Sequence, residues 1–130
     1  MSALTFHPQS CFIGGQWFPP QSGETLPLED PSTGETIGQI ARGKAADVDA
    51  AVAAARKALD GAWGKTPAAE RGRILARIGQ KVLDHADELT KLEATDVGKP
   101  LKQARVDVLA LARYMEFYAG ACDKIHGETI

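Results

Sequence analysis

Cysteine is scarce in this sequence: Cys11 and Cys122 lie far apart and share no CxxC or Cys/His spacing. Neither a disulfide framework nor a zinc site is therefore expected, and a reducing compartment is the default. No stretch approaches the roughly 18 apolar residues that span a membrane. The first eight residues also lack the basic region and apolar run of a secretory signal. We expect a cytoplasmic protein that makes no contact with membranes.

An excess of charge of either sign is also missing. Lys and Arg number 15 against 17 Asp and Glu; residues 1–65 carry five basic and seven acidic side chains, and residues 66–130 carry ten of each. No surface for nucleic acid or anionic lipid is predicted from this balance. Hydrophobic residues make up 44% of the 130 residues, enough for a modest core but not for a second complete domain.

The first part of the chain has the pattern of short strands. Apolar residues flank Gly14-Gly15, a pair that can take positive φ at both central positions of a hairpin turn, so two strands are predicted within residues 11–18. Further strands are predicted at 25–29 and 36–41, separated by a turn that contains proline and glycine. We expect a β arm over residues 1–43.

After Gly43 the hydrophobic period changes from two to 3.6, so residues 44–130 are expected to form about four helices. The second helix is predicted to have Thr66 as its N-cap and Pro67 at its first position. Gly72 and Gly79 either weaken that helix by up to about 1 kcal/mol each or mark close packing. The predicted boundaries are an end at Gly61 for the first helix, Ala86 to about Asp96 for the third and Leu101 to about Cys122 for the fourth. Because the last helix is apolar on more than one face, we expect it to contact protein on two sides.

Two patterns that suggest chemistry favour a structural interpretation instead. Gly38 to Ala45 almost matches the phosphate-binding loop, but alanine replaces the magnesium-binding hydroxyl, so we expect a strand-to-helix turn. Neither Cys11 nor Cys122 has the neighbouring base that a nucleophilic thiol needs. No independent catalytic constellation is predicted.

The histidines and Glu116 are also expected to have structural roles. The three histidines share no metal spacing, and surface or capping roles are expected for His7, His85 and His126. Glu116 lies between two tyrosines on a helix, where an ion pair with Arg113 or Lys124 is favoured over acid or base catalysis.

Five sequence blocks together resemble the amino-terminal region of the aldehyde dehydrogenase superfamily. They cover the chain from about Phe12 to Ile130. The blocks are Phe12-Ile13-Gly14-Gly15-Gln16-Trp17, Asp30-Pro31-Ser32-Thr33-Gly34-Glu35, Asp47-Val48-Asp49-Ala50-Ala51-Val52 with Glu70-Arg71, Asp96-Val97-Gly98-Lys99-Pro100, and Tyr114 to Gly120 followed by Asp123 to Gly127. The resemblance implies an α/β fold, of which this chain is the amino-terminal β arm and a helical layer, residues 44–130, of the dinucleotide-binding domain.

The resemblance also implies an activity for a longer parent enzyme. Members of the superfamily use NAD or NADP to oxidise an aldehyde to a carboxylic acid through a cysteine thiohemiacetal, and they form homo-oligomers. This sequence has no cofactor-binding glycine motif, no matching nucleophile segment and no general-base glutamate. The resemblance therefore implies that the catalytic and oligomerisation domains are absent, and that residues 1–130 alone are inactive and bind the remainder of the parent polypeptide. A stand-alone helical protein-interaction module is the alternative.

A structural monovalent cation, K⁺ or Na⁺, is a further implication of the resemblance. Many superfamily members hold one with the aspartate of the DxGKP block and a backbone carbonyl before the Asx-Pro turn, which correspond here to Asp96 and Glu29, with Leu28 as an alternative. An aspartate at a helix carboxyl end is unfavourable with the helix dipole, so a compensating partner is expected. Solvent or Lys99 could supply it instead.

Overall fold

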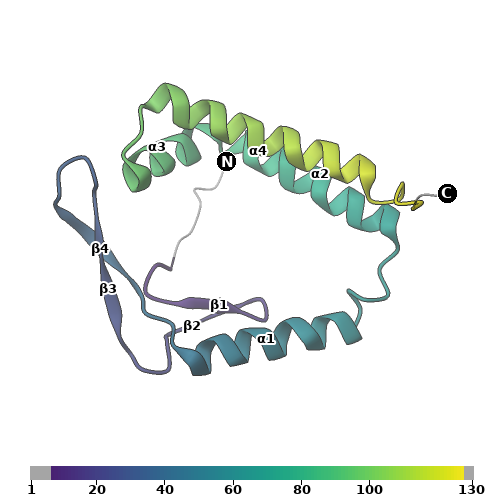
Figure 1. Ribbon diagram of the computed structural model, residues 1–130, viewed down its shortest axis with the longest axis horizontal. Coiled ribbons are helices and arrows are strands. Elements are labelled where there is room, and N and C mark those ends of the chain that lie inside the picture. Colours follow the sequence, from purple (N-terminus) through teal and green to yellow (C-terminus); the bar gives the residue numbers. More distant parts are fainter. Residues whose placement is uncertain (1–6, 128–130) are drawn as a thin grey trace. The chain divides into compact units, whose positions relative to one another are not determined.

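The computed structural model describes residues 7–127. Residues 1–6 and 128–130 lie outside the described part, and the first of these ranges includes most of the eight residues that were compared with a secretory signal. Internal contacts divide the chain after Lys65 into two compact units. The first unit contains four short strands and helix α1, and the second contains helices α2 to α4 (Figure 1). Helix α1 thus belongs to the same unit as the strands. The assignment of residues 44–130 to one helical layer remains a prediction.

Two antiparallel hairpins form in the first unit. Strands β1 (Cys11–Ile13) and β2 (Gln16–Phe18) pair through a turn in which Gly14 and Gly15 have φ of 61° and 85°. Strands β3 (Thr25–Glu29) and β4 (Thr36–Ala41) pair with an irregularity between Leu28 and Glu29. All four strands lie where the sequence predicted them, because the positive-φ glycines and the Asp-Pro turn leave the chain few other local conformations.

Helix α1 (Ala45–Asp60) completes the first unit. The turn of the first hairpin lies against it: a Cβ atom added to Gly14 would be 3.7 Å from the Cβ atom of Ala54. Small side chains of α1, among them Ala51, Ala54 and Ala58, line the same surface hollow as Gly14 and Gly15, so they leave room for the hairpin backbone. Helix α1 ends before Gly61, as the sequence predicted.

The second unit consists of α2 (Ala68–Asp84), α3 (Ala86–Val97) and α4 (Leu101–Ala121). Helix α2 begins one residue later than predicted. Pro67 has a ψ of 150° and precedes the helix, and its carbonyl accepts the first hydrogen bonds, from the amides of Glu70 and Arg71. The prediction of Thr66 as N-cap was therefore wrong by one position: proline has the required φ, but ψ decides where the helix starts.

Helix α4 packs against both α2 and α3, and Figure 1 shows α2 and α4 running side by side. The small core of this unit consists of Val82, Ala86, Val108 and Ala112, with Leu89 packed against it. Ala104 is fully buried. Other apolar side chains of α4 are exposed, among them Leu101, Val106, Tyr114, Phe117 and Tyr118. Of the helices within residues 7–127, none is both long and apolar enough to span a membrane.

Candidate functional site

The two residues expected to take part in a cation site, Asp96 through its carboxylate and Glu29 through its backbone carbonyl, belong to different units. Glu29 ends strand β3, beside the irregularity in the β3–β4 ladder, and its register partner is Thr36. Asp96 lies exposed in the last turn of α3, which terminates at Gly98 in the left-handed conformation with φ of 72°. The unsatisfied carbonyls of that last turn place partial negative charge beside the Asp96 carboxylate.

Asp96 differs from every other acidic residue in the described part of the second unit. Each of the others has a hydrogen-bonding or ion-pairing side chain: Glu70 with Arg73, Asp84 with Gln80, Asp87 with Arg105, Glu88 with His85, Glu93 and Asp107 with Lys99, Glu116 with Arg113, and Asp123 with Lys124. Asp96 has no such partner among residues 7–127. Among the acidic residues that the structure describes in this unit, Asp96 is therefore the carboxylate left for solvent or an added cation.

Lys99, which the sequence indicated as a possible partner of Asp96, binds other carboxylates. Its Nζ lies 2.6 Å from Oε1 of Glu93 and 2.7 Å from Oδ2 of Asp107, so it joins α3 to α4. Gln103 donates to the other oxygen of Asp107 at 3.1 Å. The carboxylates of Asp107 and Glu93 raise the pKa of Lys99, and Lys99 together with Gln103 lowers the pKa of Asp107. We call this segment, residues 93–107, the α3–α4 corner.

A hard monovalent cation fits the donor chemistry of this site. Alkali cations prefer oxygen ligands, and a carboxylate without a partner at the negative end of a helix supplies both an oxygen and an attractive potential. Within the described residues no group of three or more His, Cys, Asp or Glu side chains could hold a metal ion. Side chains of these residues would therefore contribute only part of the ligand set.

A second carboxylate arrangement lies at the start of α1 and was not recognised from the sequence. Asp47 is buried, with 5% of its surface exposed. Its Oδ2 accepts from the amide of Lys44 and its Oδ1 from the amide of Gln21, both at 2.9 Å. These two amide donors, that of Lys44 first, lower the pKa of Asp47. The carboxylate thus fixes the loop before β3 to the first turn of α1.

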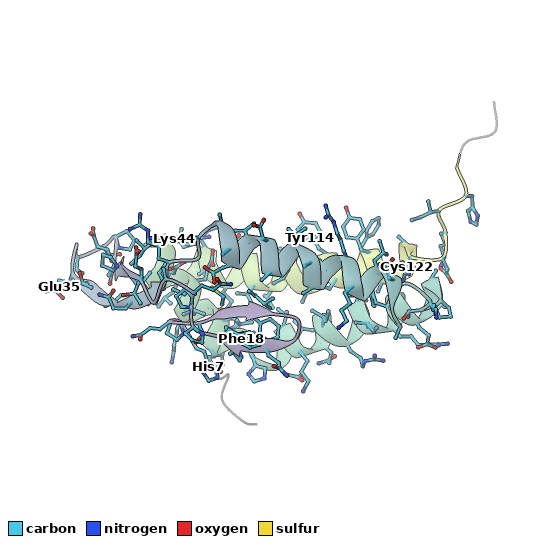
Figure 2. All side chains as sticks on the ribbon, turned by 90° about the horizontal axis from the view of Figure 1, so that it is seen from below. His7, Phe18, Glu35, Lys44, Tyr114 and Cys122 are labelled. Carbon is cyan, nitrogen blue, oxygen red and sulfur yellow. The ribbon has the colours of Figure 1, made fainter. Side chains whose placement is uncertain are left out.

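Glu24 supports the same connection from the surface. Its carboxylate pairs with the ammonium of Lys44 and, at 3.4 Å, with the guanidinium of Arg42, while its carbonyl accepts from the Arg42 amide at 2.9 Å. The hydrogen bond from Lys44 is the main cause of the lowered pKa of Glu24. Figure 2 labels Lys44 at the start of α1. The sequence did contain a signal for the role of Asp47: it is an acidic residue three places after the helix N-cap, Lys44, a position from which a carboxylate can accept from the N-cap amide.

The near match to a phosphate-binding loop is an ordinary strand-to-helix turn. Its first half lies in β4, which ends at Ala41, and α1 begins at Ala45. The ammonium of Lys44 is paired with Glu24, and its amide with Asp47. The lysine ammonium and one of the backbone amides that would bind phosphate are therefore already occupied.

The other candidate side chains have structural contacts. Cys122 is half-buried, and its thiol donates to the carbonyl of Tyr118 at 3.2 Å; Figure 2 labels it at the end of α4. Cys11 is also half-buried, and neither thiol forms a disulfide within the described residues. Glu116 pairs with Arg113 at 2.5 Å, one of its two expected partners.

Each of the three histidines has its own structural surroundings. The ring of His7 lies 5.0 Å from that of Trp17 on the first hairpin. His85 forms the junction between α2 and α3, where its amide donates to the carbonyl of Lys81 and its carbonyl accepts from Leu89. This is the capping role expected of it. His126 is exposed beyond the end of α4.

Comparison with known proteins decides the family. The model of the aldehyde dehydrogenase family matches residues 17–130. The chain belongs to the aldehyde dehydrogenase family. It is 49% identical over 120 residues to the mitochondrial benzaldehyde dehydrogenase of Antirrhinum majus, covering 91% of this chain and 22% of that protein. It is 42% identical over 127 residues to the hydroxyisobutyraldehyde dehydrogenase of Mycolicibacterium austroafricanum, covering 97% of this chain and 25% of that protein.

Solved structures of aldehyde dehydrogenases have the same fold over this region. PnpE in complex with nicotinamide adenine dinucleotide matches with a TM-score of 0.89 and 36% identity, over 95% of this chain and 26% of that one. Betaine aldehyde dehydrogenase of Staphylococcus aureus in complex with NAD⁺ matches with a TM-score of 0.89 and 31% identity, over 95% and 25%. The expected α/β fold, an amino-terminal β arm followed by four helices, is confirmed. The chain spans about a quarter of the length of the curated relatives it matches, at their amino-terminal end.

Proposed function

We propose that this chain is the amino-terminal part of an NAD(P)⁺-dependent aldehyde dehydrogenase, which oxidises an aldehyde to a carboxylic acid. The observation that carries the proposal is the match of the family model to residues 17–130. Aldehyde dehydrogenases with bound NAD among the similar structures support the cofactor class. The residues of this chain do not fit a dinucleotide site, since they contain no glycine fingerprint between a strand and a helix. The cofactor would be held by residues outside this sequence.

The contribution of these 130 residues would be scaffolding. Rate acceleration of aldehyde oxidation requires nucleophile, base and nicotinamide in one preorganised site, and no part of that set is predicted here. The apolar side chains exposed on α4 support a role in packing against the remaining polypeptide. The alternative, a stand-alone helical interaction module, would use the same surface for another protein.

Activity measurements on the full-length enzyme and on residues 1–130 test this proposal. The full-length enzyme should reduce NAD⁺ or NADP⁺ with members of a panel of aldehydes, followed by absorbance of the reduced nicotinamide. Cys11→Ser and Cys122→Ser should each retain most of that activity, because neither thiol is the proposed nucleophile. Residues 1–130 alone should show neither turnover nor saturable NAD(P)⁺ binding by calorimetry. Turnover that either serine variant abolishes would contradict the scaffold role.

The cation site is the second part of the proposal, with Asp96 and the carbonyl of Glu29 as ligands from this chain for K⁺ or Na⁺. In the full-length enzyme, Asp96→Ala should lower the melting temperature in potassium or sodium chloride and have a much smaller effect in tetramethylammonium chloride. Asp87→Ala, the same substitution at an exposed position of α3 that pairs with Arg105, is the matched control. Equal destabilisation by Asp96→Ala in all three salts would contradict cation binding.

Cytoplasmic residence and a homo-oligomeric enzyme complete the proposal. The balanced charge and the two thiols without a disulfide support a reducing, aqueous compartment. Cell fractionation and size-exclusion chromatography of the full-length enzyme test these two points. An enzyme that is secreted, or that is monomeric at micromolar concentration, would contradict them.

A further inference from the structure

The β3–β4 hairpin has two outer edges, and the hydrogen bonds at its open end show which backbone groups face them. In an antiparallel pair, residues that exchange hydrogen bonds alternate with residues whose amides and carbonyls point away from the partner strand. The amide of Arg42 donates to the carbonyl of Glu24 across the hairpin, and the amide of the preceding residue, Ala41, donates outward to the carbonyl of Pro8 at 2.7 Å. Two residues before Ala41, the amide and carbonyl of Gln39 therefore also point outward.

Proline blocks the outer edge of β3, whereas the described residues leave much of the β4 edge free. Pro27 is the register partner of Gln39, so its ring replaces the amide hydrogen that would point outward from β3. Proline at such a position prevents another strand from pairing with the edge. On β4 the amide and carbonyl of Gln39 have no hydrogen-bond partner among residues 7–127. The hairpin is thus protected against strand addition on one side and open to it on the other.

The two faces of the hairpin indicate which side chains an added strand would carry. Leu28, Gly38 and Ile40 are half-buried on one face, and the hydroxyl of Thr25 donates to the side chain of Gln39 at 3.0 Å on the other. No atom lies within 4 Å of the Cβ position of Gly38, which leaves room for an apolar side chain from a neighbouring strand. A strand that alternates apolar and polar residues would match both faces.

We propose that the outer edge of β4 binds an extended strand of the polypeptide that follows residue 130 in the parent enzyme, through the amide and carbonyl of Gln39. This inference rests on the function proposed above, which supplies the longer parent. The chain spans 22–25% of two curated relatives, at their amino-terminal end, so most of the parent backbone is available as the occupant. A strand of the same polypeptide also has a far higher effective concentration than a separate molecule.

The site has a defined length. The carbonyl of Pro8 already accepts from the amide of Ala41, the last residue of β4, and this ends the free edge on one side. The turn before Thr36 ends it on the other. A strand of about five residues fits this length, and its main-chain hydrogen bonds would turn a two-stranded hairpin, which is marginally stable alone, into a three-stranded sheet.

Hydrogen exchange of the full-length enzyme, resolved to single amides by mass spectrometry, tests the added strand. After correction for intrinsic rates, the amide of Gln39 should exchange at least about tenfold more slowly than that of Thr25, the factor expected for one net hydrogen bond. Thr25 is the matched control because its register partner is Ala41, so its amide also points outward, but on the β3 edge that Pro27 blocks.

A proline substitution tests the same edge through stability. Gln39→Pro removes the outward donor and places on β4 the block that Pro27 places on β3, without removing a hydrogen bond of the hairpin. It should lower the melting temperature of the full-length enzyme by at least about 2 °C. Gln39→Thr keeps the amide and a good strand former, and should leave the melting temperature nearly unchanged. If Gln39→Pro does not fold, the amide exchange of the unsubstituted enzyme still decides.

The outcomes distinguish the added strand from the function on which it rests. An active enzyme in which Gln39 exchanges as fast as Thr25 overturns the added strand alone. Equal protection of both amides also overturns it, because general burial of the hairpin would then explain the result. Protection of Gln39 that is lost when the enzyme is diluted to single subunits overturns the choice of occupant, since a second copy would then supply the strand. An enzyme that oxidises no aldehyde overturns the proposed function, whatever the exchange rate of Gln39.

Discussion

Single side chains stabilise the connections between elements in both units. Asp47 is the clearest case, because one buried carboxylate accepts from the backbone amides of Gln21 and Lys44 and so joins a loop to a helix. A buried acceptor of this kind stabilises only in its ionised form, since protonation would leave one of the two amides facing a hydroxyl donor. Its contribution to stability must therefore depend on pH.

The sign of this dependence follows from the lowered pKa of Asp47 in the folded chain. A carboxyl group with a lowered folded pKa stabilises the fold above its unfolded pKa of about 3.9, and the contribution is lost as the pH falls through the folded pKa. Asp47→Asn should be destabilising at pH 7 and progressively less so below pH ~4. Urea denaturation at a series of pH values measures the difference in free energy of unfolding between Asp47→Asn and the original chain. Asp49→Asn, at an exposed position in the same helical turn, is the control. A pH-independent difference between Asp47→Asn and the original chain would contradict ionic stabilisation.

Pairs of elements are held together by close backbone approach as much as by side-chain burial. A Cβ atom added to Gly72 on α2 would lie 2.5 Å from the carbonyl oxygen of Ala119 on α4. One added to Gly79 would lie 3.2 Å from the carbonyl oxygen of Ala112 and from the Cβ atom of Met115. The two glycines therefore permit α2 and α4 to pack closely, which explains why both are tolerated within a helix.

Gly72→Ala should accordingly destabilise the second unit although alanine is the better helix former. The intrinsic gain of up to about 1 kcal/mol is outweighed by the displacement of a backbone carbonyl, and overpacking typically costs about 1–3 kcal/mol. Gly120→Ala on α4 is the matched control: nothing lies within 4 Å of its Cβ position, and it should be neutral or stabilising. Thermal unfolding of the 130-residue chain measures the melting temperatures of both variants. A Gly72→Ala variant that melts at a higher temperature than the original chain would contradict the close packing of the two helices.

At the scale of the whole molecule, apolar surface exceeds what these residues cover among themselves. Leu101, Tyr114, Phe117 and Tyr118 of α4 are 58–63% exposed. A groove of about 460 Å³ also opens between α2 and α4, and it is lined by Ala76, Gly79, Gln80, Leu83, Leu109, Ala112, Arg113 and Glu116. A small core beside so much exposed apolar surface is consistent with a chain that spans about a quarter of its relatives.

Residues 1–130 expressed alone should therefore self-associate at micromolar concentration, because a second copy is then the available apolar partner. Replacing both Val106 and Phe117 by lysine should shift the chain toward monomer, whereas replacing the exposed polar residues Lys102 and Gln103 by alanine should not. Static light scattering measures the mass of each variant. A strictly monomeric original chain across this concentration range would contradict the expectation and favour the self-contained interaction module.

The sequence by itself determined the family, the order of the elements and most of their boundaries. These are local properties: Gly14-Gly15 and Asp30-Pro31 restrict backbone dihedral angles, and the change from a period of two to one of 3.6 after Gly43 separates strands from helices. It also indicated correctly that Glu116 forms an ion pair, with Arg113 as one of two candidate partners, and that the segment around Lys44 is a turn. Each of these inferences depends on residues that lie close together in the sequence.

Only the tertiary structure decided which distant residues meet. The sequence left open whether Gly72 and Gly79 weaken α2 or mark close packing, and the carbonyls of α4 beside them show that they mark close packing. It did not indicate that the Asp47 carboxylate accepts a hydrogen bond from the amide of Gln21. Nor did it indicate that the Lys99 ammonium binds the carboxylates of Glu93 and Asp107. Hydrogen bonds and ion pairs depend on atomic distances of about 3 Å. Those distances are set by how helices and loops pack, and residue spacing along the chain does not specify them.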